Sequence, residues 1–255
     1  MSCSDCTLER LARHSIGSVP YLNVRPLVHA LPDNIKYLEP VPLARDFAAG
    51  KFDIALLPVA ASFESPGCRI VDGPAIASDG PVRSVILVLE KPLQQARTIA
   101  LDSASKTSAN LVKVLCERHW GIFPAYVPEG VPADAELWIG DRALKIQGGN
   151  SRREILDLGA AWKEFTGLPF IYAAWVIAPH SEIAPDEIEL FRRKSLEGLE
   201  ARGRIAGNPV ELDYLTNCIR YKMDSSYKLG MARFAEELRN LGLLPAGAPG
   251  LPSFI

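Results

Sequence analysis

The sequence lacks a long apolar run, a surplus of basic residues and a secretion signal. Nowhere among its 255 residues is there a run approaching the ~18 apolar residues that a membrane-spanning helix needs. The formal net charge is -2, which leaves no basic field to attract nucleic acid or an acidic membrane surface. The first residues, MSCSDCTLERLARH, contain no apolar core typical of a signal peptide. We therefore expect a soluble, cytoplasmic protein that binds neither nucleic acid nor membranes.

Cysteine and histidine are scarce and scattered. The chain has five cysteines and four histidines, and Cys3 and Cys6 form its one close cysteine pair. A zinc site needs about two more ligands at comparable spacing. We therefore predict no metal site and interpret residues 1–14 as a flexible leader. Cys116 shares a helix face with Leu111 and Leu115, which favours a role in core packing.

The common catalytic signatures are also absent. The sequence contains no P-loop, no GxSxG, no GxGxxG and no HExxH motif. We expect no cofactor, and no Cys–His or Ser–His pair is suggested by neighbouring positions. No feature of the sequence indicates the oligomeric state.

Short apolar runs alternate with segments of helical periodicity, which is the pattern of an α/β fold. Strands are expected at 15–19, 35–41, 53–59, 68–77, 84–89, 98–101, 125–127, 136–139, 154–158 and 170–177. Helices are expected from about residue 26, at 43–49, 106–119 and 160–166, after Asn208-Pro209, and through Met231, Phe234, Leu238 and Leu241. Along the helix after Asn208 we expect Leu212, Leu215 and Ile219 to form one apolar stripe.

The order of these elements predicts two lobes. One lobe would comprise residues 15–90 together with 176–255, and the other residues 91–175. A chain that leaves one lobe and later returns to it leaves a cleft at the hinge. Ligands bind such units at the carboxyl ends of strands and at helix N-termini.

Two strand-end loops of the first lobe carry polar candidates. Residues 17–23 include Tyr21 and Asn23, and the Asn23 carboxamide would serve equally as a ligand contact or a helix cap. Residues 78–84 include Arg83 and Ser84 at the entrance to a buried strand. A buried guanidinium needs an anionic partner, which would be a ligand, Asp79 or another carboxylate.

Two further loops belong to the second lobe. Residues 103–108 place small hydroxyl residues and free amides at the positive end of a helix, which suits a carboxylate but is also ordinary N-capping. Gly140 permits a close backbone approach, and Asp141 would either cap the next helix or contact a ligand. The residues alone indicate a binder of a small organic anion in an inter-lobe cleft.

Five segments resemble one enzyme family, the chorismate dehydratases of the futalosine route to menaquinone. They are VPYLNVRPL (19–27), ASDGPVRSVILV (77–88), SASKTS (103–108), LWIGDRAL (137–144) and DLGAAWKEFTGLPFIYAAW (157–175). The resemblance runs from about Ile16 to Leu244 and leaves out the leader and the tail. It implies a fold like that of the type II periplasmic binding proteins, in agreement with the two lobes.

The resemblance also implies a hydro-lyase. Chorismate would lose water to give 3-[(1-carboxyvinyl)oxy]benzoate, and formation of the aromatic ring makes the step strongly downhill. The 103–108 turn would hold one carboxylate and Arg83 would offset the second charge. Asn23 and Ser84 would be catalytic, at the departing hydroxyl or the reacting carboxylate. The expected substrate-binding residues are Tyr21, Arg83, Ser105, Thr107, Ser108, Gly140 and Asp141.

These motifs offer no obvious protein base, since Asp79 and Asp141 are explained as turn residues. We therefore hypothesise a substrate-assisted elimination, in which the enolpyruvyl carboxylate takes the ring proton. The alternatives are a non-catalytic carboxylate-binding protein and the sister enzyme 1,4-dihydroxy-6-naphthoate synthase. The effector domain of a regulator is a further alternative, although it would need a DNA-binding segment.

Overall fold

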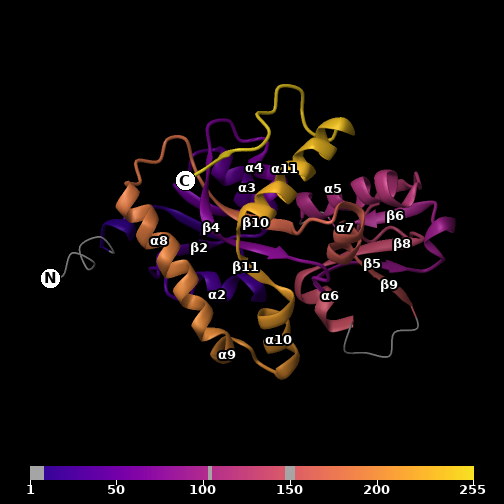
Figure 1. Ribbon diagram of the computed structural model, residues 1–255, viewed down its shortest axis with the longest axis horizontal. Helices are drawn as coiled ribbons and strands as arrows, with labels where there is room; N and C mark the ends of the chain where they lie inside the picture. Colours follow the sequence, from indigo (N-terminus) through magenta and orange to yellow (C-terminus); the bar gives the residue numbers. More distant parts are fainter. Residues whose placement is uncertain (1–8, 103–104, 147–152) are drawn as a thin grey trace.

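Two β-sheets, each with its own helices, lie side by side along the long axis of the molecule (Figure 1). The computed structural model describes residues 9–102, 105–146 and 153–255. In the first sheet the strand order is β11-β4-β10-β3-β1-β2, with β12 beside β4. The second sheet has the order β7-β6-β8-β5-β9. This architecture confirms the predicted α/β class.

The first sheet takes its strands from both ends of the chain. They are β1 (Ile16–Ser18), β2 (Ile35–Tyr37), β3 (Ile54–Pro58), β4 (Arg69–Ser78), β10 (Phe170–Ile177), β11 (Arg220–Lys222) and β12 (Ser253–Phe254). The second sheet is built from β5 (Val85–Leu89), β6 (Thr98–Leu101), β7 (Ala125–Pro128), β8 (Ala135–Ile139) and β9 (Glu154–Asp157). Every residue of β3 and β5 is buried, because helices and loops cover both faces of each sheet.

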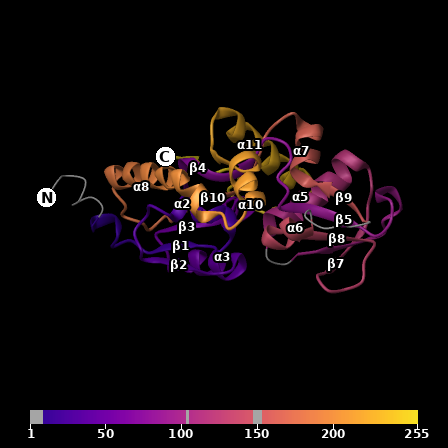
Figure 2. The same ribbon diagram turned by 90° about the horizontal axis from the view of Figure 1, so that it is seen from below.

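Helices pack on both sides of the first sheet, with α2 and α8 on one side and α3, α4 and α11 on the other (Figures 1 and 2). The helices are α2 (Arg25–Val28), α3 (Pro40–Ala48), α4 (Val59–Ser62), α5 (Lys106–Leu115), α6 (Gly140–Ile146), α7 (Leu158–Thr166), α8 (Pro185–Glu197), α9 (Arg202–Ile205), α10 (Pro209–Asp213) and α11 (Ser225–Asn240). Short 3₁₀ turns are η1 (Leu22–Val24), η2 (Leu93–Gln95) and η4 (Gly198–Ala201), and π-helical turns are η3 (Cys116–Trp120) and η5 (Tyr214–Cys218). Within the described ranges, none of these helices has the length and apolarity to cross a membrane.

Most of the expected elements are present, with shifts at their ends. The expected strand at 35–41 ends at Tyr37, because Pro40 occupies the first turn of α3, where its fixed φ favours a helix start. Asn208 caps α10 as expected, its side chain accepting a hydrogen bond from the Glu211 amide at 3.0 Å. Cys116 is fully buried, which confirms its packing role.

The apolar stripe expected after Asn208 was wrong at one position. Leu215 and Ile219 are buried, but Leu212 is exposed. The α-helix ends at Asp213 and a π-helical turn follows, so the helical phase changes between Leu212 and Leu215.

The strands of the two sheets show that the chain crosses between the lobes at positions other than the boundaries expected at residues 90 and 175. Strand β5 belongs to the second sheet although it was expected in the first lobe, and β10 belongs to the first sheet. The chain therefore crosses between the sheets at 79–84 and returns at 158–169. A buried apolar strand fits either sheet equally well, so hydrophobic pattern alone does not decide its membership.

One carboxylate joins the two crossings. Asp157, at the end of β9, accepts hydrogen bonds from the amides of Val82 and Arg83 in the first crossing. It also caps α7 by accepting from the amides of Gly159 and Ala160 in the second. A Cβ at Gly159 would lie 2.5 Å from the Gly80 carbonyl oxygen, so glycine is needed for this close approach. The hinge is thus a packed and hydrogen-bonded unit.

Candidate functional site

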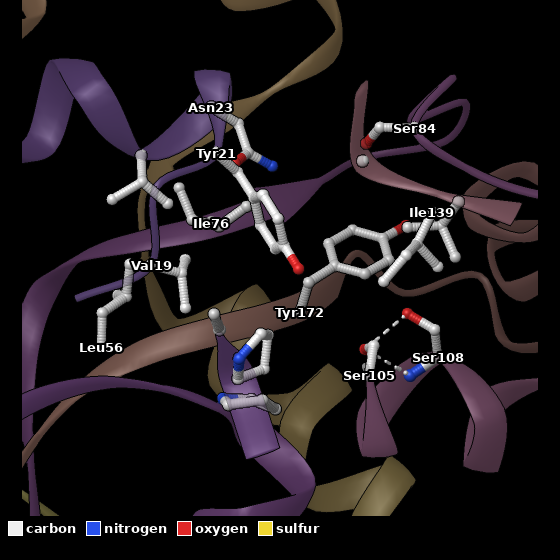
Figure 3. A pocket seen from close by; sticks show the side chains of 16 residues that line it. Val19, Tyr21, Asn23, Leu56, Ile76, Ser84, Ser105, Ser108, Ile139 and Tyr172 are labelled. Atoms are coloured by element: carbon white, nitrogen blue, oxygen red, sulfur yellow. Dashed lines mark hydrogen bonds between the residues drawn. The ribbon is translucent and has the colours of Figure 1, made fainter. Parts of the chain in front are cut away.

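A cavity lies between the two sheets and is lined by residues from both lobes (Figure 3). Its free space, counted together with the open mouth, is about 600 Å³. The walls are mostly apolar and include Val19, Leu56, Ile76, Val85 and Ile139. The polar lining consists of Tyr21, Asn23, Ser84, Ser105, Ser108, Gly140 and Tyr172.

Asn23 and Ser84 lie along one side of this cavity (Figure 3). Asn23 sits inside the 3₁₀ turn η1, whose cap position is Tyr21, so the capping alternative does not apply to it. Its carboxamide oxygen is buried without a hydrogen-bond partner among the described residues. A buried acceptor without a partner carries a desolvation cost that a ligand donor would remove. Ser84, directly before β5, is also buried.

Ser105 and Ser108 lie on the opposite side of the cavity, at the start of α5 (Figure 3). The Ser105 hydroxyl accepts from the Ser108 amide at 3.2 Å and donates to the Ser108 hydroxyl at 2.9 Å. Ser105 therefore caps the helix and lines the cavity at once. The Ser108 hydroxyl keeps its own proton for a ligand, next to the positive end of the helix.

Two tyrosine hydroxyls in the cavity wall are held by protein partners. Tyr21 donates to the Glu39 carboxylate at 3.0 Å, and the Tyr172 hydroxyl lies 3.1 Å from that of Ser78. Burial, reinforced for Tyr21 by Glu39, raises the pKa of Tyr21 above its ordinary value, and burial does the same for Tyr172. Both side chains stay neutral phenols at physiological pH.

Gly140 lies beside Ser84, where the antiparallel pairing of β5 with β8 continues by one residue. Its amide donates to the Ser84 carbonyl at 2.8 Å, and its φ of +57° is in the left-handed region. A Cβ there would meet nothing within 4 Å, so the need for glycine comes from the backbone conformation.

Three expected site residues lie outside the cavity lining. Arg83 donates from Nη1 to the Asp213 carboxylate at 2.6 Å. The sequence had left open a ligand, Asp79 or another carboxylate as its partner, and here the partner is another carboxylate. Thr107 is buried, and its hydroxyl accepts from the Ala60 amide at 3.1 Å, across the lobe boundary. Asp141 lines a separate hollow together with Arg25 and Lys145. The sequence identified these polar residues but not the way in which their side chains point.

The cavity lining contains no Asp, Glu, His, Lys or Arg among the described residues. Asp79, the other carboxylate considered from sequence, pairs with Lys163 at 2.7 Å. An anion in this cavity would therefore be held by hydroxyls, a carboxamide and helix amides, without a cation in contact. The described residues also contain no group of three or more His, Cys, Asp or Glu side chains that could hold a metal ion. Cys3 and Cys6 lie outside the described residues.

Sequence reasoning missed Tyr214, a buried residue near the site. Burial raises the pKa of its hydroxyl, and the neighbouring Ser84 and Asn23 side chains partly offset that rise. The pKa of Tyr214 stays well above its ordinary value, so this side chain too is neutral. No motif marks it, because it lies between Leu212 and Leu215 in a segment that reads as an ordinary amphipathic helix.

Solved structures with the same architecture share little sequence with this chain. A crystal structure of a protein from Archaeoglobus fulgidus has a TM-score of 0.71 at 16% identity and covers 91% of this chain and 98% of that one. The periplasmic aliphatic sulphonate binding protein SsuA from Escherichia coli has a TM-score of 0.61 at 14% identity, covering 95% and 93%. These likenesses show a periplasmic-binding-protein-like fold.

Sequence relatives and a family model extend over most of the chain. Chorismate dehydratase from Thermus thermophilus is 28% identical over 94% of this chain and 97% of its own length. Chorismate dehydratase from Campylobacter jejuni is 26% identical over 89% and 98%. A family model described as menaquinone biosynthesis matches residues 14–239. The chain therefore belongs to this menaquinone biosynthesis family.

Proposed function

We propose that this protein is a chorismate dehydratase, which converts chorismate to 3-[(1-carboxyvinyl)oxy]benzoate and water. The observation that carries the proposal is the inter-lobe cavity, whose polar groups gather on two opposite sides with apolar walls between them. Chorismate has a matching distribution, with two carboxylates on a largely apolar ring framework. Family membership and the dehydratase relatives support the same reaction.

The start of α5 is the proposed site of the ring carboxylate. The Ser108 hydroxyl and the amides of Lys106 and Thr107 would donate to it, because amides of a first helical turn lack partners within the helix and Ser105 occupies the Ser108 amide. The helix dipole adds about 0.3–2 kcal/mol, so the hydrogen bonds contribute most of the binding. Gly140 and Tyr21 would enclose the ring from the two lobes.

Asn23 and Ser84 are the proposed catalytic residues at the reacting end. The proton on C3 would pass to the enolpyruvyl carboxylate, the C3–H electrons would form the new ring double bond, and the C4–O bond would break. The departing hydroxide would take up the transferred proton and leave as water. Asn23 and Ser84 would hydrogen-bond the departing hydroxyl and the reacting carboxylate, so their interactions strengthen as charge moves.

The absence of acidic and basic side chains from the described cavity lining supports the substrate's own carboxylate as the base. The neutral tyrosines of the wall cannot accept a proton at physiological pH. The protein's contribution would then be orientation and stabilisation of developing charge.

The test is turnover by the purified protein. Incubation with chorismate should give the aromatic product, followed by ultraviolet absorbance and identified by mass spectrometry. Ser84→Ala and Asn23→Ala should each lower kcat by about 10–1,000-fold while changing the Kd for chorismate by less than about threefold. Binding of chorismate without turnover would indicate a carboxylate-binding protein instead. Weakened binding at unchanged kcat in the variants would contradict the catalytic roles.

A further inference from the structure

Arg83, which directly precedes the proposed catalytic Ser84, has an uncommon backbone conformation. Its φ is +65°, and it is the one residue other than glycine with a positive φ in the described part of the chain. This left-handed region is unfavourable for any residue that has a side chain, so surrounding contacts must hold it there. Residues held in this way concentrate at functional sites. The conformation matters here because it sets the direction in which the chain enters β5.

Hydrogen bonds fix the peptide groups on both sides of Arg83. The Arg83 amide donates to the Asp157 carboxylate at 2.6 Å, next to the Val82 amide, which donates to the same carboxylate at 3.1 Å. On the other side, the carbonyl of Ser84 accepts from the Gly140 amide at 2.8 Å. These bonds involve only main-chain atoms of the 82–84 segment. A glycine at position 83 would make them too, and without strain.

The arginine side chain adds an anchor that glycine lacks. Its Nη1 donates to the Asp213 carboxylate at 2.6 Å and lies 3.7 Å from the Cys218 sulfur. Asp213 ends α10, and Cys218 ends the π-helical turn η5 that follows. Arg83 does not line the cavity, so its side chain ties the chain crossing to the C-terminal segment. The Ser84 side chain, one residue later, lines the cavity (Figure 3).

We propose that Arg83 is a positioning residue, whose ion pair with Asp213 holds the left-handed backbone that directs Ser84 toward the reacting end of the substrate. The inference rests on the proposed dehydratase function. It gives Arg83 a role other than the substrate contact expected from the sequence, because Arg83 acts through Ser84 and does not touch chorismate. When the anchor is removed, the backbone relaxes toward a negative φ and Ser84 loses its preset direction. Preset groups avoid the cost of ordering during the reaction.

A second ion pair on the same crossing provides a matched control. Asp79, at the start of the 79–84 crossing, pairs with Lys163 of α7 at 2.7 Å. Both pairs are partly exposed, with side-chain exposures of 25% and 51% for Arg83 and Asp213 and of 40% and 46% for Lys163 and Asp79. Arg83→Met and Lys163→Met each remove one cation from this crossing and keep an unbranched side chain. They differ in distance along the chain from Ser84.

The experiment measures kcat, KM and the thermal midpoint with chorismate for Arg83→Met, Asp213→Ala, the double variant and Lys163→Met. Arg83→Met and Asp213→Ala should each lower kcat about tenfold with KM changed by less than about twofold, because only the reacting end is disturbed. The double variant should lie within about threefold of either single variant, because both substitutions break the same ion pair. Lys163→Met should leave kcat unchanged.

The Ser84→Ala background separates positioning from a general structural effect. If Arg83 acts through the Ser84 side chain, adding Arg83→Met to Ser84→Ala should lower kcat by less than about threefold further. A full tenfold further loss in that background would overturn the inference. So would a wild-type kcat in Arg83→Met, or a raised KM at unchanged kcat, which would show that Arg83 contacts the substrate.

Asp213→Ala keeps the inference testable if Arg83→Met fails to fold, because Asp213 is half exposed and its loss leaves the Arg83 backbone contacts in place. An unchanged kcat for Asp213→Ala would then overturn the inference. A wild-type protein that does not dehydrate chorismate would contradict the proposed function itself. An active wild type whose kcat is insensitive to the ion pair would contradict the positioning role alone.

Discussion

At the scale of single residues, the candidate site depends on neutral hydrogen-bonding groups. Among the described residues, the cavity wall presents hydroxyls, a carboxamide and backbone amides. Outside it, Arg83 pairs with Asp213 and Asp79 pairs with Lys163. Neutral donors need no counter-charge when the cavity is empty. They also orient a dicarboxylate by geometry more than by net charge.

The first residue-scale prediction concerns pH. Burial holds the pKa of Tyr21 and Tyr172 above its ordinary value, so both remain protonated as pH rises through neutrality. Both substrate carboxylates are ionised above about pH 5. We therefore expect kcat to change by less than about threefold from about pH 6 to about pH 9, measured by steady-state turnover of chorismate. A bell-shaped profile centred in that interval would reveal a protein acid or base and contradict substrate assistance.

The second residue-scale prediction concerns the two carboxylates considered from sequence. Asp79 pairs with Lys163, and Asp141 faces a different hollow, so neither is placed to take the ring proton. Asp79→Asn and Asp141→Asn should each keep kcat within about threefold of wild type. If either variant lost all turnover while still binding chorismate, the substrate would not be the base.

At the scale of elements, the hinge owes its geometry to Asp157 and Gly159. Asp157 joins two chain crossings that are far apart in sequence, and Gly159 lets the second crossing touch the Gly80 carbonyl of the first. The DLG start of the segment at 157–175, which the family resemblance emphasised, thus has a structural explanation: it joins the two chain crossings between the lobes.

Replacing Asp157 tests this role. Asp157→Ala should lower the free energy of unfolding by about 2–4 kcal/mol, since it removes a helix cap and leaves the Val82 and Arg83 amides unpaired. It should also lower kcat, because Ser84 follows directly. Asp224→Ala is the matched control, as Asp224 caps α11 away from the cavity through the Ser226 and Tyr227 amides. The control should cost about 1 kcal/mol in urea unfolding and leave kcat unchanged. Equal effects of the two substitutions on stability and kcat would show that Asp157 is an ordinary cap.

At the scale of the whole molecule, the alternation of strands and helices was predictable because it depends on local periodicity. The sheet to which β5 and β10 belong was not, since both are uniformly apolar. Within the 103–108 loop, sequence indicated hydroxyls at a helix start, but Ser108 faces the cavity and Thr107 faces α4. Which of these two side chains faces the cavity depends on how α5 is rotated about its axis relative to the first lobe. Only the tertiary structure fixes that rotation. Tyr214 had no sequence signal for the same reason.

Contacts across the lobe boundary keep the cavity walls together in this structure. Lys106 pairs with Glu64 at 2.5 Å, Thr107 receives the Ala60 amide, and Arg83 pairs with Asp213. These contacts come from the same short segments that carry Ser105, Ser108 and Ser84. The relative position of the lobes and the arrangement of the polar cavity wall are therefore coupled.

The most direct test of the whole account is a crystal structure of the protein with bound 3-[(1-carboxyvinyl)oxy]benzoate. The account predicts one carboxylate at the start of α5, against Ser105 and Ser108, and the enolpyruvyl end beside Asn23 and Ser84. Product bound elsewhere, such as in the hollow between Arg25 and Lys145, with the inter-lobe cavity empty, would contradict it.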